Sequence, residues 1–216
     1  MYDLLAITGG YILGSIPFAL IISRLFGIRD IREVGSGNIG ATNAWRAAGP
    51  AAGIMVTVGD IGKGVLAVFI ASLMPESALG AANLKLIAGI AAVVGHVFPV
   101  FLLFRGGKGV NTALGVMIMI LPIETLIALL GFILIVVISR YISLGSVLAT
   151  VIFFTSVLTA YILKLEDIPV LYLIVSGILM LLIIITHRTN IKRLLSGREN
   201  RFSFHSRKNR EGADNA

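Results

Sequence analysis

The sequence predicts an all-α polytopic membrane protein with about seven transmembrane helices. Of its 216 residues 57% are hydrophobic and only 13% are charged, and the mean hydropathy is +0.97. About a quarter of a soluble globular chain is charged. The apolar residues gather in runs comparable to the roughly 20 residues that cross a bilayer. Basic and acidic connections alternate between these runs.

Charge, proline or glycine bounds each of seven apolar runs: Leu4–Leu25, Pro50–Met74, Leu84–Phe104, Val110–Leu121, Ile123–Ser139, Ser143–Leu163 and Ile168–Thr186. We expect the first run to be a retained helix, because no basic segment precedes it and no small-residue cleavage site follows it. Pro122 separates the fourth run from the fifth. We therefore expect two short or tilted helices there, or one re-entrant hairpin.

The charges of the connections predict the orientation of the chain. One set of connections is basic, with Arg24, Arg29, Arg32 and Arg46, then Arg105 and Lys108, then Arg140, then Arg188, Lys192 and Arg193. The other set carries Asp3, Glu76, Glu124, Glu166 and Asp167, with only Lys85 and Lys164 as cations. Because cytoplasmic loops are enriched in Lys and Arg, the N-terminus is expected outside and the C-terminus in the cytoplasm.

The length leaves room for one integral-membrane domain, expected at residues 1–196. Residues 197–216 are charged and lack apolar periodicity, so we expect a disordered basic cytoplasmic tail. Its cations, Arg201, Arg207, Lys208 and Arg210, suit anionic lipid headgroups rather than nucleic acid. The chain has no cysteine, which excludes disulfides, a thiolate nucleophile and sulfur-ligated metals. No cofactor or metal is expected, since no carboxylate cluster or histidine pair is present to hold one.

Two glycine-rich segments lie on the basic side. The first is Gly35-Ser36-Gly37-Asn38-Ile39-Gly40-Ala41-Thr42-Asn43, followed by Arg46. A dinucleotide-binding fold would need a strand before this segment, and an apolar span stands there instead. The glycines can let backbone N–H groups converge on an anion, and Arg46 adds a planar guanidinium donor.

The second segment is Phe104-Arg105-Gly106-Gly107-Lys108-Gly109. It is not a P-loop, because the residue five before Gly107 is Leu102 rather than Gly. The alternative for the first segment is a flexible loop without a ligand. The alternative for the second is that its basic residues only follow the bias of Lys and Arg toward cytoplasmic loops.

Other polar residues lie within or at the ends of the spans. Asp60 and Lys63 are three residues apart, so they share a helical face. Intramembrane charges are costly unless they pair or line a wet cavity, and we favour a polar pocket, joined by His96, over a purely structural ion pair. His187 and Asn190 can point to the same place, with Ser143 in the string Ser139–Ser146 as another donor. No serine-hydrolase elbow or zincin motif is present.

Six strings in this order resemble one family: GSGNIGATN…R, D-x-x-KG, GH-x-FP, F-x-GGKG, RY-x-SLGS and HR-x-NI-x-RL. Over about residues 8–199 the chain is similar to the PlsY family, the bacterial acyl-phosphate:glycerol-3-phosphate acyltransferases. Ile39 departs from the proline of many members. The His-x-x-x-x-Asp pair of the other large acyltransferase group is absent, since Phe101, Lys192 and Arg210 stand five residues after the three histidines.

The resemblance implies an enzyme of the bacterial cytoplasmic (inner) membrane whose active site faces the cytoplasm. It would transfer a fatty acyl group from acyl phosphate, not acyl-CoA or acyl carrier protein, to the sn-1 hydroxyl of glycerol 3-phosphate. The products are lysophosphatidic acid and inorganic phosphate, in the first committed step of phospholipid synthesis. Membrane lipid is an expected partner, and a soluble acyl-phosphate-synthesising enzyme is a candidate one. The alternative is an organic-phosphate or lipid-phosphate transporter, which would show polar groups on both faces and repeated halves.

The resemblance and donor chemistry together imply the site residues. Arg46, Lys108, His187 and Asn190 are expected to be catalytic and, with Ser143, to contact phosphate. Ser36, Asn38, Thr42 and Asn43 are expected to form the phosphate cradle beside them, and Asp60, Lys63 and His96 a supporting polar pocket. Three groups can take the proton of the attacking hydroxyl: His187, because imidazole titrates near neutral pH, Asp60, or a substrate phosphate. We expect that no protein base is essential.

Overall fold

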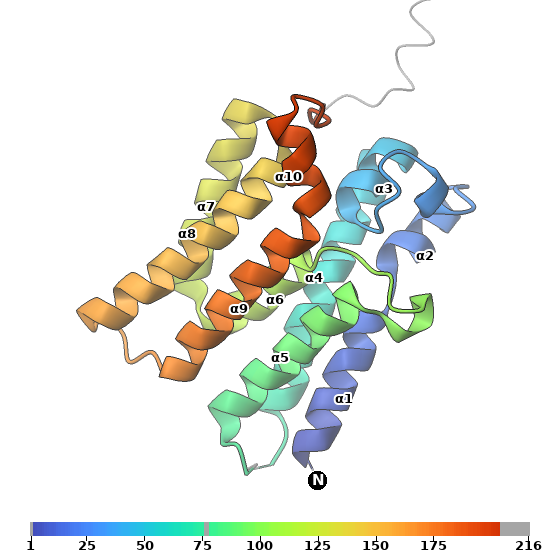
Figure 1. Cartoon of the computed structure of the whole chain (residues 1–216). Coiled ribbons are helices and arrows are strands. Elements are labelled where there is room, and N and C mark those ends of the chain that lie inside the picture. The colour runs from blue at the N-terminus through green and yellow to red at the C-terminus, as the bar shows by residue number, and fades with distance from the viewer. Residues whose placement is uncertain (1, 76–77, 204–216) are drawn as a thin grey trace, which may run out of the picture. The chain divides into compact units, whose positions relative to one another are not determined.

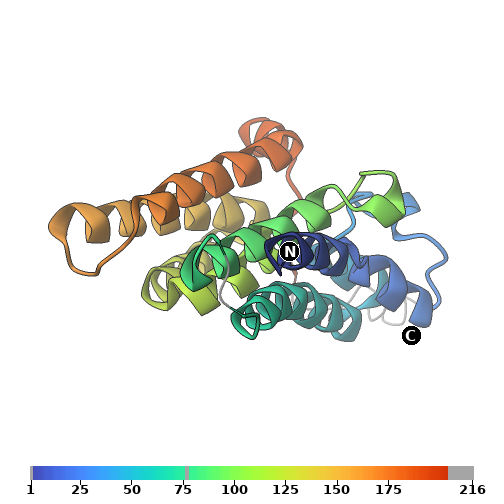
Figure 2. The ribbon, with the colours of Figure 1, turned by 90° about the horizontal axis from the view of Figure 1, so that it is seen from below.

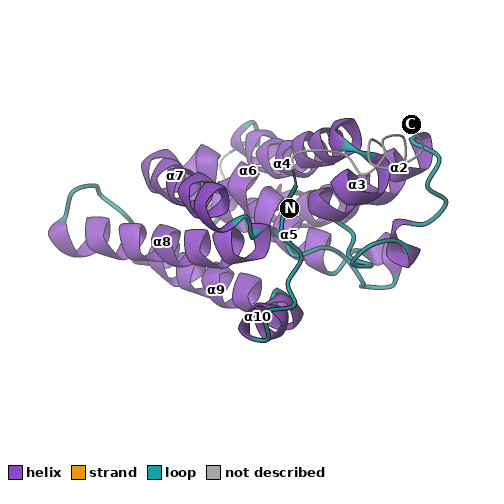
Figure 3. Ribbon diagram, turned by 90° about the horizontal axis from the view of Figure 1, so that it is seen from above, coloured by secondary structure: helices purple, strands orange, loops and turns teal. Residues whose placement is uncertain are grey.

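The computed structural model describes residues 2–75 and 78–203, and every regular element in these ranges is a helix (Figure 3). The predicted all-helical architecture is therefore confirmed. In chain order (Figure 1) the elements are α1 (Tyr2–Ser15), α2 (Phe18–Leu25), the 3₁₀ turn η1 (Ile31–Glu33), α3 (Ala41–Ala48), α4 (Pro50–Ser72), α5 (Ala81–Val97), the 3₁₀ turn η2 (Val100–Leu102), α6 (Val110–Ile120), α7 (Pro122–Ser139), α8 (Ile142–Leu163), α9 (Val170–Thr186) and α10 (Arg188–Leu195).

Each of the seven apolar runs corresponds to a helix or a helix pair. Within the described ranges, five segments are long and apolar enough to cross a membrane: α1 with α2, α4, α5 with η2, α7, and α8. The pair α9 and α10, bent by 60°, makes a sixth if it is one span. The fourth run forms α6, whose 11 residues rise about 16 Å, roughly half of the hydrocarbon core. The number of spans and the orientation of the termini stay predictions.

The first apolar run is not one continuous helix, which corrects our expectation for Leu4–Leu25. α1 ends at Ser15 and α2 begins at Phe18. Pro17 has no backbone N–H and disfavours helical geometry at Ile16, so the helical hydrogen bonding is broken inside the span. The freed Ile16 carbonyl accepts a hydrogen bond from Lys63 Nζ of α4 at 3.0 Å. A side chain from a neighbouring helix thus donates to the backbone where the helical hydrogen bonding is broken.

The chain divides into two compact units, and each is described by itself. The first covers the described residues of Met1–Gly115 together with Ser203. In this unit α1, α4 and α5 pack pairwise, and α1 runs beside α5 (Figure 2). A Cβ added at Gly10 or Gly14 would collide with the backbone of Ala88 or Ala92. These two glycines, four residues apart, therefore allow the close helix contact that is typical of membrane interiors.

The second unit covers Val116–Phe202. α8 packs against both α7 and α9, and α10 contacts α8 and α9. Glycine again permits the contact, because a Cβ at Gly145 of α8 would meet Val136 and Phe132 of α7. Between α9 and α10 the chain bends at His187. The polar residues that follow therefore form a separate helix, α10, with its own direction.

Candidate functional site

The first glycine-rich segment folds as a loop between η1 and α3, and Asn43 fastens it. The Asn43 amide donates to the carbonyl oxygens of Ile31 (3.0 Å) and Val34 (2.9 Å) and accepts from the Ser36 N–H (2.9 Å). Gly35 lies in the left-handed region (φ +63°), and a Cβ there would collide with Asn43 Oδ1. The buried Asn43 amide therefore holds the backbone of this loop in place.

The other predicted cradle residues stay partly accessible around this loop. Ser36 and Asn38 lie in it, Thr42 lies in the first turn of α3, and Arg46 lies in the last turn. All four are half-buried. Hydroxyl, amide and guanidinium donors gathered in this way can bind an anion.

The second glycine-rich segment lies directly on the end of α5. The N–H of Gly106 donates to Val97 O at 3.1 Å, and that of Gly107 donates to His96 O at 3.0 Å. A Cβ at Gly107 would stand 2.7 Å from Ile39 O, so the two glycine-rich loops meet at this point. Lys108 follows, half-buried, just before α6 begins. The structure thus brings two predicted anion-binding segments, which are far apart in sequence, into contact within one unit.

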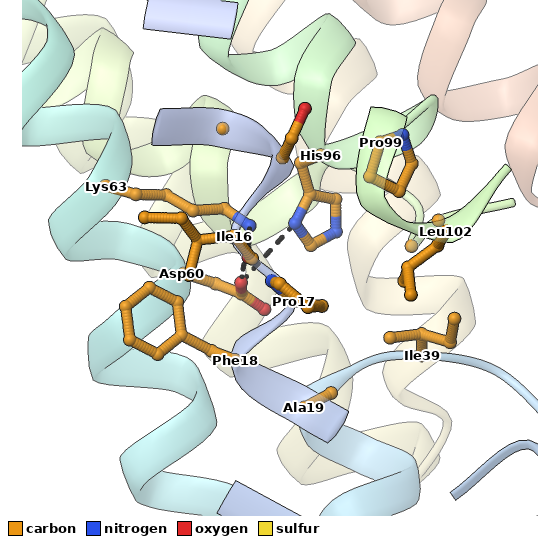
Figure 4. Close-up of a pocket in the computed structure, with 14 residues that line it drawn as sticks. Ile16, Pro17, Phe18, Ala19, Ile39, Asp60, Lys63, His96, Pro99 and Leu102 are labelled. Atoms are coloured by element: carbon orange, nitrogen blue, oxygen red, sulfur yellow. Dashed lines mark hydrogen bonds and ion pairs between the residues drawn. The ribbon is translucent and has the colours of Figure 1, made fainter. Parts of the chain in front are cut away.

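Asp60, Lys63 and His96 lie together around a small pocket under these loops (Figure 4). Asp60 Oδ1 accepts a bond from Lys63 Nζ at 2.9 Å and lies 3.4 Å from His96 Nδ1. Their side chains are at most 8% exposed. Gly106, Gly107 and Ile39 also line the pocket, so the polar cluster borders both loops.

In the second unit the predicted donors surround a carboxylate that our sequence analysis did not select. Glu199 Oε1 accepts from Ser143 Oγ (3.0 Å) and Asn190 Nδ2 (2.7 Å), and Oε2 accepts from Arg193 Nε (2.7 Å). The donors come from α8 and α10, and Gly197 (φ +69°) turns the chain back toward them. The arrangement is an anion site whose described occupant is the chain's own carboxylate.

Burial disfavours the charged form of Glu199, but hydrogen bonds from Arg193, Asn190 and Ser143 outweigh it and hold the pKa below the ordinary 4.5. The available signal in the sequence was its charge. Glu199 is the single acid in residues 188–210, a stretch that holds eight Lys and Arg residues. A lone acid among many cations indicates an ion pair, but we treated residues 197–216 as a tail without structure.

His187 lies buried at the junction of α9 and α10, and its Nδ1 is 2.8 Å from Ile183 O. A carbonyl oxygen can only accept, so Nδ1 carries the proton and Nε2 is an acceptor in the neutral ring. That tautomer is the one a general base needs. Asn190, also buried, is one turn away on α10.

The predicted site residues therefore fall into two groups. Ser36, Asn38, Thr42, Asn43, Arg46, Asp60, Lys63, His96 and Lys108 belong to the first unit, and Ser143, His187 and Asn190 to the second. Within the described ranges no three His, Asp or Glu side chains gather as a metal site would require. Glu76, His205 and the predicted lipid-anchoring Arg207, Lys208 and Arg210 lie outside the described residues.

Comparison with known proteins reveals extensive similarity. The family described as glycerol-3-phosphate acyltransferase matches residues 4–197. A glycerol-3-phosphate acyltransferase of Chlorobaculum tepidum is 45% identical, with 92% of this chain and 95% of that protein covered. That of Trichlorobacter lovleyi is also 45% identical, with 91% and 95% covered. Glycerol-3-phosphate acyltransferase 2 of Bacillus anthracis is 41% identical, with 92% and 98% covered.

Two solved structures are similar over nearly the whole chain. One is the glycerol 3-phosphate form of PlsY, an integral membrane glycerol 3-phosphate acyltransferase, with a TM-score of 0.83 at 40% identity, covering 94% of this chain and 96% of that chain. The other is the lysophosphatidic acid form, with a TM-score of 0.81 at 39% identity, covering 94% and 97%.

Proposed function

The chain belongs to the glycerol-3-phosphate acyltransferase family, and from this premise we propose that it makes lysophosphatidic acid from acyl phosphate and sn-glycerol 3-phosphate. The chain is an integral membrane acyltransferase of phospholipid synthesis. The observation that carries the proposal is the 94% coverage of the chain by a structure of PlsY in its glycerol 3-phosphate form. The acyl donor is inferred from the six motifs of the sequence.

The proposed chemistry explains why cations and neutral donors suffice. An acyl phosphate is a mixed anhydride, so the sn-1 hydroxyl oxygen can attack its carbonyl carbon while the bond from that carbon to the phosphate oxygen breaks. The hydroxyl proton leaves with the phosphate as inorganic phosphate. The protein has to hold two phosphate groups of about −1.5 to −2 charge each, orient the hydroxyl and stabilise the oxyanion. No acyl-enzyme intermediate is required.

We assign the phosphate contacts to Arg46 and Lys108 in the first unit and to Ser143, His187 and Asn190 in the second. Glu199 occupies the Ser143 hydroxyl proton and one Asn190 N–H. Ser143 has one proton and would have to exchange partners. The enzyme would lie in the bacterial inner membrane with these residues facing the cytoplasm and the acyl chain in the lipid.

A donor-competition assay tests the proposal. Purified protein in detergent or lipid is given labelled glycerol 3-phosphate with acyl phosphate, acyl-CoA or acyl carrier protein, and lysophosphatidic acid is measured. We expect product from acyl phosphate alone. Product from acyl-CoA or acyl carrier protein would overturn the donor assignment. No product from folded protein would overturn the proposal and favour the transporter, which vesicle uptake of labelled glycerol 3-phosphate would then test.

A further inference from the structure

Three buried polar side chains of the first unit, Asp60, Lys63 and His96, have no step in the proposed chemistry. We propose that Asp60 and His96 are positioning residues: Asp60 fixes the His96 ring, and the ring fixes the Gly106–Gly107 backbone that presents Lys108. This inference rests on the proposed function, in which Lys108 holds a substrate phosphate.

The position of the Asp60 carboxylate is set by Lys63, which is itself held by other contacts. Lys63 Nζ donates to Asp60 Oδ1 at 2.9 Å and to Ile16 O, at the break between α1 and α2, at 3.0 Å. Its ammonium also lies 5.9 Å from the centre of the Phe18 ring. Separating a buried carboxylate from its partner is strongly destabilising. The Asp60 carboxylate therefore stays beside the Lys63 ammonium. The Oδ1 atom that Lys63 holds is also the one that faces His96.

The imidazole passes this constraint to the loop. Its Nδ1 lies 3.4 Å from Asp60 Oδ1, and a proton on Nδ1 sets the ring orientation, as carboxylates commonly do for histidines in functional sites. The opposite edge then faces Gly107, where an added Cβ would collide with Nε2. The His96 ring therefore packs directly against the Gly107 backbone.

The backbone of His96 completes the contact. His96 O accepts from the Gly107 N–H, and Val97 O accepts from the Gly106 N–H. The two residues before Lys108 are thus held by the end of α5 through two hydrogen bonds and by the His96 ring through packing. Lys108 is the next residue, so its Cα is fixed by this contact. If the His96 ring could rotate, this packing contact would be lost and the Gly106–Gly107 backbone could shift.

The burial of the cluster indicates positioning rather than contact with substrate. The side chains of Asp60 and His96 are only 3% and 8% exposed, and Asp60 Oδ1 is already engaged by Lys63 Nζ. Misplacing Lys108 would weaken a phosphate contact that is made before and during the reaction. A contact of that kind changes KM more than kcat.

The first test compares His96→Asn and Asp60→Asn with Lys108→Ala. Asparagine keeps an N–H near the Nδ1 position but removes the Nε2 edge. We expect both variants to raise the same substrate's KM that Lys108→Ala raises, by about tenfold, the effect of losing one hydrogen bond to a charged group, with kcat little changed. Thr57→Val is the matched control, because the Thr57 hydroxyl bonds to Gly53 O within α4. It should leave both KM values unchanged.

A double-variant cycle tests the contact itself. Gly107→Ala should be severely impaired, because its methyl group collides with His96 Nε2. Combined with His96→Asn, the collision with the ring is removed, while the 2.7 Å approach of the methyl group to Ile39 O stays in both backgrounds. We expect the double variant to lose less kcat/KM than the product of the two single losses, which indicates coupling. Losses that simply multiply would overturn the proposal.

Binding of glycerol 3-phosphate and of inorganic phosphate, measured by calorimetry without acyl donor, separates the remaining outcomes. Variants that lower the melting temperature but leave KM and phosphate affinity unchanged would show a structural ion pair and overturn positioning. If His96→Asn does not fold, Asp60→Asn gives the same comparison. A wild-type chain that makes no product but shows the expected pattern of phosphate binding would overturn only the proposed function.

Discussion

At the scale of single residues, Glu199 joins α8 to α10 through one carboxylate. Glu199→Gln would turn an ionised acceptor of three hydrogen bonds into a neutral group with its own N–H donors. We expect the free energy of unfolding to fall by about 2 kcal/mol near neutral pH, since hydrogen bonds to charged groups contribute this much. Thermal unfolding in detergent measures it. Glu166→Gln, an exposed acid, is the control.

The same variant predicts a pH dependence. Because the pKa of Glu199 is lower in the folded chain than the ordinary 4.5, its contribution to stability is fully present above the unfolded-state pKa. It is lost as the pH falls through the folded-state pKa. The difference in melting temperature between wild type and Glu199→Gln should therefore close in acidic buffer. A difference that persists there would show that the charge of Glu199 is not responsible.

His187 provides a residue-scale test of the proton step. His187→Asn keeps a donor toward Ile183 O but removes the Nε2 acceptor. If a phosphate oxygen takes the proton, kcat should fall by less than about a hundredfold, the lower end of what a general base contributes. Steady-state kinetics with acyl phosphate measures it. A loss of several powers of ten in kcat, with unchanged affinity for glycerol 3-phosphate, would identify His187 as an essential base.

At the scale of elements, glycine determines how closely α1 approaches α5. A methyl group at Gly14 would fall on the backbone of Ala92, whereas Gly9 on the same helix has open space around it. Gly14→Ala should lower the free energy of unfolding by about 2 kcal/mol, the cost of overpacking, and Gly9→Ala should not. Melting temperatures in one detergent compare them. Equal effects would mean that helix propensity, rather than the contact, sets the stability.

The elements also show what a single sequence can and cannot predict. Apolar runs locate the helices because a bilayer selects for length and hydropathy. They did not reveal the break at Pro17, since hydropathy is unchanged across it. The glycine-rich motif and the family resemblance placed Asn43 in the phosphate cradle. They did not predict that its amide bonds to the loop backbone, because sequence spacing does not give side-chain direction. Glu199 was missed because a charge-rich segment without apolar periodicity carries no signal of packing.

At the scale of the whole molecule, described residues beyond position 196, the expected end of the membrane domain, make contacts with the second unit. Beyond α10, Glu199 bonds to three donors, Arg201 Nε lies 3.3 Å from Tyr141 Oη, and Phe202 N donates to Arg140 O at 2.6 Å. These contacts tie the segment to the start of α8. Residues 197–202 are therefore part of the folded second unit.

Truncation tests this at the same scale. A chain ending at Ser203 should keep the melting temperature and activity of the full chain in detergent. A chain ending at Ser196 lacks Glu199, Arg201 and Phe202, so it should be destabilised at least as much as Glu199→Gln. Unfolding and lysophosphatidic acid formation measure both. Equal behaviour of the two truncated chains would show that residues 197–203 contribute nothing to the fold.

The broken first span also bears on how the protein is inserted during synthesis. Asp60 and Lys63 enter the membrane with α4, and each such charge raises the cost of insertion by about 3 kcal/mol. Ile16 O, the backbone acceptor of Lys63, lies 47 residues earlier in the chain, so the ribosome has already delivered it when α4 emerges. His96 follows only afterwards. The first span is thus made before α4 and can supply a hydrogen-bond acceptor to Lys63, whose charge is offset by Asp60 on the same helix.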